Sequence, residues 1–372
     1  MKFSRLLLLA VALPLAACEI ATDPNAANPD APANLTYQLI PSGNANQPLG
    51  VLLAWDIPTS GRANSFNVYG RETSNAAWTL RATTTSPTFH DAGTPEAQYY
   101  VATRDQNGTE IANSNTITVD LVSELPSPTG LGSISLNGAV QLFWDPNAVN
   151  ASTSFDHYSV YSSSYDNSRA VCSADWVSEG STVSDGFLVA NLTNGVSRCY
   201  AVSAVTLDGH ETARSAAKLD TPRYDARNMF VYSRQARPDS AGFLFLDETT
   251  KKIGSVATTT RTDLDFTIER HDDGSLWFSP ARTAVTMALY STTPVTDLTS
   301  IDKAPLSGLG PVSIEAVPGY AYVFRVQKTD GVHYAAARVA FVTATYVVFD
   351  WSYQSGIGNP ELNVIPTKPA LK

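Results

Sequence analysis

The side chains that could carry out chemistry are densest in the segment Glu269–Gly274, which reads Glu-Arg-His-Asp-Asp-Gly. Its carboxylates and imidazole could bind a metal ion or transfer protons. The same residue types are typical of a charged hairpin tip, where Asp and Gly supply the turn geometry and the charges stay solvated. We therefore interpret this segment as a turn and predict neither a metal site nor a catalytic residue there.

His271 and His333 are the histidines of the C-terminal third, and each stands beside a predicted hairpin turn. Together they could ligate haem or share a transition metal. The alternative interpretation is that both are unrelated surface histidines. A second pair of residues, Asp263 and Asp265, alternates on one predicted strand, where we expect surface charge rather than a calcium or glycosidase-type site.

Aromatic residues are also concentrated in the C-terminal third, where exposed rings could stack on sugars or anchor a protein partner. Most of them occupy alternating strand positions and are expected in the core. Tyr353 and Gln354 stand beside the Gly-rich segment Ser-Gly-Ile-Gly-Asn-Pro-Glu-Leu. With His271 and His333 they are the candidate ligand-binding residues.

Known catalytic and phosphate-binding motifs are missing from the sequence. It contains no Gly-x-Ser-x-Gly elbow, no Walker-type loop, no His-Glu-x-x-His and no Cys-x-x-Cys. The chain of 372 residues has 16% charged residues, a net charge of -10 and a pI of about 4.9. A basic stripe for phosphate backbones is absent, so nucleic acid is not an expected partner. We expect a protein that is not an enzyme and needs no cofactor.

The N-terminus predicts export and anchoring. Lys2 and Arg5 precede the apolar run LLLLAVALPLAA, which is too short to span a bilayer, so residues 1–17 are expected to be a signal peptide. The small residues before Cys18 resemble the lipobox of bacterial lipoproteins. That resemblance implies acylation of Cys18, as with palmitate, and Glu19 implies the outer membrane of the cell envelope. Residues 18–31 are rich in Pro, Asn and Ala and are expected to form a flexible tether.

The remaining cysteines are Cys172 and Cys199. Once Cys18 is assigned to lipid, an oxidising compartment favours one disulfide bond between them. Two free buried thiols are the alternative.

An internal repeat fills the first half of the mature chain. Each copy opens with Pro-x-x-Leu, continues to a strand ending in Trp-Asp, and closes with a Tyr-x-Val strand before an Asp-Gly or Asn-Gly turn. The Trp residues are Trp55 and Trp144, and the Tyr residues are Tyr99 and Tyr200. Alternating strands separated by turn signals predict antiparallel β-sandwiches.

This repeat resembles the fibronectin type III family. The resemblance implies two tandem modules, residues 32–121 and 126–221, and tyrosine corners at Tyr99 and Tyr200. The second copy is longer, and its extra length contains Cys172, which we expect to pin an inserted hairpin to the strand of Cys199. Type III modules often accompany bacterial carbohydrate-active enzymes, so a hydrolase or its accessory protein is one alternative function.

Residues 228–365 lack a third copy of the repeat, but their apolar and polar residues alternate between turn signals. This pattern predicts a third, mostly antiparallel β domain after a short linker at 221–228. Its clearest hairpin turns at residues 329–331. The Leu264-Asp265-Phe266 strand, the hairpin leading to Tyr334 and the strand around Trp351 resemble HmuY-type lipoproteins. That resemblance implies haem or metal capture, although no haem ligand of the family matches a position here.

The sequence thus predicts an all-β protein in which two type III sandwiches precede a third β domain. The function we expect is that of a membrane-anchored binding lipoprotein, with the modules as a spacer that presents the C-terminal domain to a protein or glycan. Haem or metal capture is the second hypothesis.

Overall fold

A computed structural model describes residues 28–45, 47–122, 124–145, 149 and 152–363. Cys18, the predicted signal peptide and most of the predicted tether lie outside these residues. The described chain consists of β-strands, turns and two single-turn 3-10 helices, Pro238–Ser240 and Leu298–Ser300, so the all-β prediction is confirmed. Within this part of the chain, no helix is long and apolar enough to cross a membrane.

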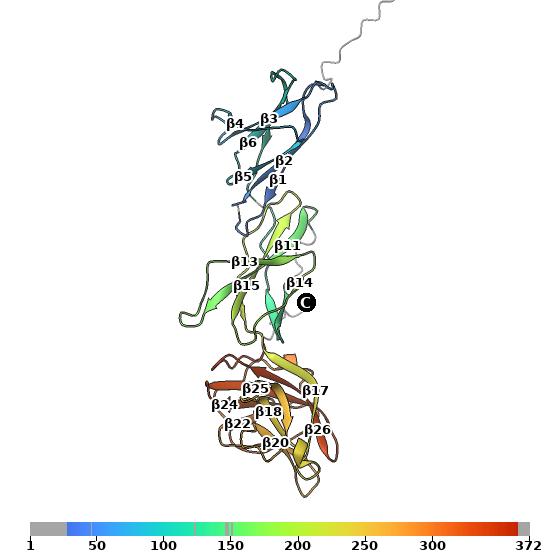
Figure 1. Cartoon of the computed structure of the whole chain (residues 1–372), viewed down its shortest axis with the longest axis vertical. Helices are drawn as coiled ribbons and strands as arrows, with labels where there is room; N and C mark the ends of the chain where they lie inside the picture. Colours follow the sequence, from blue (N-terminus) through green and yellow to red (C-terminus); the bar gives the residue numbers. More distant parts are fainter. Residues whose placement is uncertain (1–27, 46, 123, 146–148, 150–151, 364–372) are drawn as a thin grey trace, which may run out of the picture. The chain divides into compact units, whose positions relative to one another are not determined.

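The chain divides into two compact units. The first contains residues up to Thr36, Leu53–His90 and Glu96–Val119, and the second contains Tyr37–Leu52, Asp91–Pro95 and the chain from Asp120 onward. Figure 1 colours the strands along the sequence.

The first repeat forms a three-stranded and a larger antiparallel sheet. One sheet has the order β1-β2-β5, with bounds Ala33–Ile40, Gly50–Asp56 and Thr88–Ala92. The other has the order β4-β3-β6-β7, with β8 also paired to β6, and bounds Thr79–Thr84, Ser65–Arg71, Gln98–Arg104, Glu110–Asn113 and Ile117–Thr118. Trp55 packs on Phe66 with ring centroids 5.5 Å apart. Tyr99 accepts a hydrogen bond from the Glu96 N–H at 2.7 Å, which is the predicted tyrosine corner.

The second repeat has the same division into sheets. One sheet has the order β14-β10-β9, with bounds Gly186–Val189, Ala139–Phe143 and Gly132–Leu136. The other has the order β12-β11-β15-β16, with β13 also paired to β11, and bounds Val171–Cys172, Phe155–Asp166, Arg198–Thr206, Lys218–Asp220 and Val177–Thr182. Trp144 packs on Tyr158 at 5.1 Å. The corner predicted at Tyr200 is wrong, because its buried hydroxyl has no partner among the described residues.

The disulfide between Cys172 and Cys199 is present, with Cα atoms 5.9 Å apart, as the sequence predicted. Cys172 lies on the two-residue strand β12, where it pairs with Tyr165 at the end of β11. Cys199 lies on β15, whose partner positions are Ser163 on β11 and Leu219 on β16. The bond therefore fixes the far end of the long β11 hairpin to the centre of the sheet. A disulfide is typical of proteins that fold outside a reducing cytosol.

The C-terminal part is a third sandwich of two five-stranded sheets. One has the order β17-β26-β25-β24-β22, with bounds Tyr224–Tyr232, Tyr346–Gln354, Val332–Val342, Ala321–Gln327 and Val285–Leu289. The other has the order β19-β18-β20-β21-β23, with bounds Ile253–Ala257, Gly242–Leu246, Phe266–Arg270, Leu276–Pro280 and Ile314–Glu315. The hairpin predicted at 329–331 joins β24 to β25.

The core of this sandwich is aromatic and lies between its two sheets. It includes Phe243, Phe245, Phe266, Phe278, Phe324 and Phe349. A smaller cluster covers the outer face of β24 and β25, where Leu298, Ile301 and Leu362 pack on Val323 and Ala336. These strands are consequently buried on both faces, which explains their nearly continuous apolar sequence.

The linker predicted at 221–228 is wrong from Tyr224 onward, because β17 begins there and pairs with β26 in the register Tyr224 to Tyr353. The C-terminal domain therefore starts earlier than predicted. Arg223 immediately precedes this strand, and its side chain has no solvent exposure. Its guanidinium donates to the Leu362 carbonyl and pairs with Asp225 at 3.0 Å. This junction is a packed segment.

Candidate functional site

His271 and His333 have separate surroundings on different sheets. His271 follows β20, and its ring stacks on Trp277 with centroids 4.4 Å apart. His333 lies on β25 and is 1% exposed, with Nε2 3.0 Å from an Asp330 oxygen and Nδ1 3.2 Å from the Gln354 carbonyl. His333 is therefore not the surface histidine that one interpretation assumed. Among the residues that the structure describes, no group of three or more His, Cys, Asp or Glu could hold a metal ion.

Tyr353 and Gln354 are both fully buried, so the exposed ligand contacts expected of them are wrong. The Tyr353 ring stacks on His333 and on Phe245. Burial raises the pKa of its phenol, and the hydroxyl has no partner in the described part of the chain. Gln354 has a positioning role. Its Oε1 accepts from the Gly356 N–H at 3.0 Å and its Nε2 donates to the Glu361 carbonyl at 3.1 Å.

Asp265 is also buried, which corrects the expectation of surface charge. The strand β20 begins after it, at Phe266. Its carboxylate accepts from Lys328 Nζ at 2.9 Å and from Arg282 at 3.0 Å. Asp263 pairs instead with Arg261 at 2.6 Å. These carboxylates are structural ion pairs and do not share a site.

The Glu269–Gly274 segment is the predicted hairpin turn. Arg270 pairs with Leu276 across it, and the Gly274 N–H donates to the His271 carbonyl at 2.9 Å. Its charges are therefore at a solvated tip.

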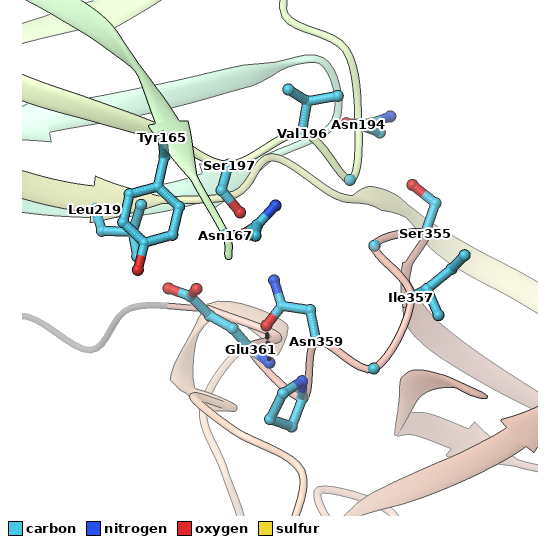
Figure 2. Close-up of a pocket in the computed structure, with 14 residues that line it drawn as sticks. Tyr165, Asn167, Asn194, Val196, Ser197, Leu219, Ser355, Ile357, Asn359 and Glu361 are labelled. Carbon is cyan, nitrogen blue, oxygen red and sulfur yellow. Dashed lines mark hydrogen bonds between the residues drawn. The ribbon is translucent and has the colours of Figure 1, made fainter. Parts of the chain in front are cut away.

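The Gly-rich segment after Gln354 forms one wall of a cleft of about 690 Å³ in the second compact unit. The facing wall comes from the second repeat (Figure 2). The lining residues are Tyr165, Asn167, Asn194, Gly195, Val196, Ser197, Leu219 and Ser355–Glu361. We refer to this site as the polar cleft.

The disulfide positions the upper wall of the polar cleft. Tyr165 is the second-last residue of β11 and lies opposite Cys172, and Asn167 begins the turn that leads to β12. Ser197 immediately precedes β15, and its hydroxyl is 2.8 Å from that of Thr221. Because Cys172 is bonded to Cys199, the tip carrying Tyr165 and Asn167 is fixed relative to this strand.

The lower wall is held by close backbone contact. Gly195 has φ +81°, and a Cβ atom there would lie 2.5 Å from Ser355 Oγ and 2.7 Å from Gly356 N. Only glycine fits this approach without displacing the backbone. Asn359 then accepts from the Glu361 N–H at 3.0 Å and donates to the Thr221 hydroxyl at 3.3 Å. These bonds orient Glu361 at the end of the loop.

Glu361 is the one carboxylic acid among the described lining residues, and none of them is Lys, Arg or His. Burial raises its pKa to about 7, and the Asp220 carboxylate adds to the effect, while Lys218 and Lys303 oppose it. Its carboxyl group accepts no hydrogen bond from the described residues. Figure 2 shows the carboxyl of Glu361 and the hydroxyl of Tyr165 directed toward one another across the gap.

The polar cleft has the chemistry of a binding site. The side chains of Tyr165, Asn167 and Glu361 have no hydrogen-bond partner among the described residues, so they are available to a ligand. The sequence indicated the Gly-rich loop beside Gln354, but gave no signal for the opposing Tyr165 and Asn167, which lie about 190 residues away.

No protein-family model matches the sequence, and no curated protein matches it. Among solved structures, a fibronectin type III-like protein from Clostridium thermocellum is 25% identical over 26% of this chain and 92% of that one, with a TM-score of 0.21. A segment of two type III domains from chicken tenascin is 13% identical, covering 51% of this chain and 98% of that one, at 0.21. A DUF4466 family protein from Parabacteroides merdae is 12% identical, covering 62% and 95%, at 0.29. The structural neighbours of this chain thus include type III-like domains and a DUF4466 protein.

Proposed function

We propose that this protein is an extracytoplasmic binding lipoprotein. Lipid on Cys18 anchors it to the outer membrane, the tether and the two repeats act as a spacer, and the ligand binds at the polar cleft beside the C-terminal sandwich. The observation that carries the proposal is the cleft itself. Its described lining presents polar side chains without partners among the described residues, together with the carboxylic acid of Glu361.

The compartment is supported by independent features. The leader and the small residues before Cys18 fit export followed by acylation. The disulfide fits an oxidising environment. Several acyl chains on one cysteine hold a protein stably at a membrane, since each buried methylene contributes about 0.8 kcal/mol.

The anchor is tested by comparing the parent with Cys18→Ser in a Gram-negative host. We expect the parent to incorporate labelled palmitate and to sediment with outer membranes, and the variant to do neither. Palmitate-free parent protein in the soluble fraction would contradict the anchor.

Binding at the polar cleft is tested by thermal-shift screening of the full chain against sugars, amino acids, nucleosides and haem. Asn167 is exposed at the cleft mouth, so Asn167→Trp is expected to fill the cleft without disturbing the fold. Asn75→Trp, in an exposed turn between β3 and β4, is the matched control. Compounds that stabilise the parent and the control but not Asn167→Trp support the site. Stabilisation that survives in Asn167→Trp contradicts it, and a haem absorbance shift that survives there would favour haem capture instead.

A further inference from the structure

We infer that the ligand of the polar cleft is a neutral oligosaccharide, bound through its hydroxyl groups by Glu361, Asn167 and Tyr165. This inference rests on the proposed function, because it names the ligand class for the same site.

The size of the cleft suits a ligand of a few sugar rings. Clefts of about 300–1,000 Å³ enclose most of the surface of small organic ligands. At about 690 Å³, the polar cleft lies in the middle of this range.

The charge of the lining selects against anions. None of the described lining residues carries a positive charge, and Glu361 contributes a negative one when ionised. A phosphate, a carboxylate or the propionates of haem would therefore find no ionic partner among the described lining residues, and the cations nearby, Lys218 and Lys303, already act on Glu361. Neutral ligands avoid this penalty.

Hydrogen-bonding capacity favours hydroxyl groups in particular. The Asn167 amide and the Tyr165 hydroxyl each donate and accept, as a sugar hydroxyl does. The carboxyl of Glu361 accepts from two adjacent hydroxyls when it is ionised, and bonds to a charged acceptor are the stronger kind.

Exposed aliphatic side chains on both walls complete the match. Val196 is 51% exposed and Ile357 is 62% exposed, although both are apolar. Figure 2 shows both side chains turned away from the gap between Tyr165 and Glu361, so they lie at the rim, where the C–H faces of further sugar rings would contact them. A cationic amine would form an ion pair with Glu361 but would make no contact with the aliphatic side chains and no hydrogen bond to the amides.

The test is binding of the full-length protein to an array of neutral oligosaccharides of glucose, xylose, mannose, galactose and N-acetylglucosamine, followed by calorimetry on the best binder. We expect Glu361→Gln to weaken binding about tenfold, since it removes one charge-assisted acceptor. Asn167→Ala should weaken it about fivefold, which is the loss of ordinary hydrogen bonds. Glu315→Gln, an exposed carboxylate on β23, is the matched control and should leave affinity unchanged.

Ionic strength separates a sugar from an amine. The affinity of a neutral sugar should be nearly independent of salt, whereas binding of spermidine or a lysine peptide to Glu361 would weaken as salt rises. Preference for these cations would overturn the inference. Absence of binding to every neutral oligosaccharide would also overturn it. The proposed function would be tested separately, because any compound that stabilises the parent but not Asn167→Trp would still support binding at the polar cleft.

Discussion

Removal of the Cys172–Cys199 bond should destabilise the second repeat selectively. The bond closes a loop with a sequence separation of 27 residues. The chain-entropy relation for a loop of this length gives about 3.5 kcal/mol of constraint on the unfolded chain. We expect the double substitution Cys172→Ser and Cys199→Ala to lower the free energy of unfolding of this repeat by about that amount.

The assay is native-state hydrogen exchange on the full chain, because it resolves each sandwich separately. The central strand β15 is almost entirely buried, so its amides exchange through unfolding of the whole repeat. A loss of about 3.5 kcal/mol corresponds to roughly several-hundredfold faster exchange. Amides of β3 and β6, which lie in the first unit, are the internal control and should not change.

Two results would refute this reasoning. Exchange in β15 that changes less than about threefold would show that the bond does not limit the unfolded chain. Equal acceleration in β3 and β6 would show a general loss of structure instead of a local one. Parent protein treated with reductant should reproduce the behaviour of the double variant.

Three further predictions concern single side chains. The pKa of Glu361 rises from 4.5 to about 7 on folding, so the stability that its protonated form contributes is present below about pH 4.5 and is lost as pH rises through 7, by about 3 kcal/mol. The urea midpoint of the parent should therefore decline over this pH range, and that of Glu361→Gln should decline less. Parallel curves for the two proteins would contradict this. Lys328→Met should lower the free energy of unfolding in urea by about 3 kcal/mol, because Asp265 then keeps only Arg282 as its cation. The exposed control Lys252→Met should change this free energy little. Equal urea midpoints for the parent and Lys328→Met would show that the Lys328–Asp265 pair is dispensable. Tyr353→Phe should leave the free energy of unfolding unchanged or raise it by up to about 1 kcal/mol, since the buried hydroxyl has no partner among the described residues. It should also leave ligand affinity unchanged. Loss of binding by calorimetry would show that Tyr353 contributes to the ligand site.

Periodicity was sufficient to predict the strands of the two repeats. The alternation around Trp55 and Trp144 depends only on the two-residue period of a strand and on one buried face. That is local information, so the sheets of both repeats followed from it. The disulfide was also predictable, because only Cys172 and Cys199 remained after Cys18 was assigned to lipid.

Burial of polar residues could not be predicted in the same way. Asp265 resembles a surface charge until Lys328, 63 residues later, is placed against it. Gln354 belongs to the end of β26, where both faces are covered and the alternation of exposed and buried positions stops. Such burial depends on contacts between distant segments, which no local pattern records.

The polar cleft was the hardest feature to predict. Its lower wall could be guessed from the glycines after Gln354, which indicate a loop with unusual backbone angles. Its upper wall is set by the insertion that distinguishes the second repeat from the first. No spacing rule connects Tyr165 with Glu361, because a binding site between separate segments is defined only by the packing of those segments.

The burial of Arg223 has a practical consequence for dissecting the molecule. A basic residue in a segment between two sandwiches would ordinarily be an obvious place for trypsin to cut, but a side chain without exposure cannot enter a protease. Shortening the chain to begin at 228 would delete both Arg223 and the first four residues of β17, and would leave the Leu362 carbonyl without the Arg223 donor. A C-terminal fragment made this way would misrepresent the intact protein, and fragments should begin upstream of the second repeat.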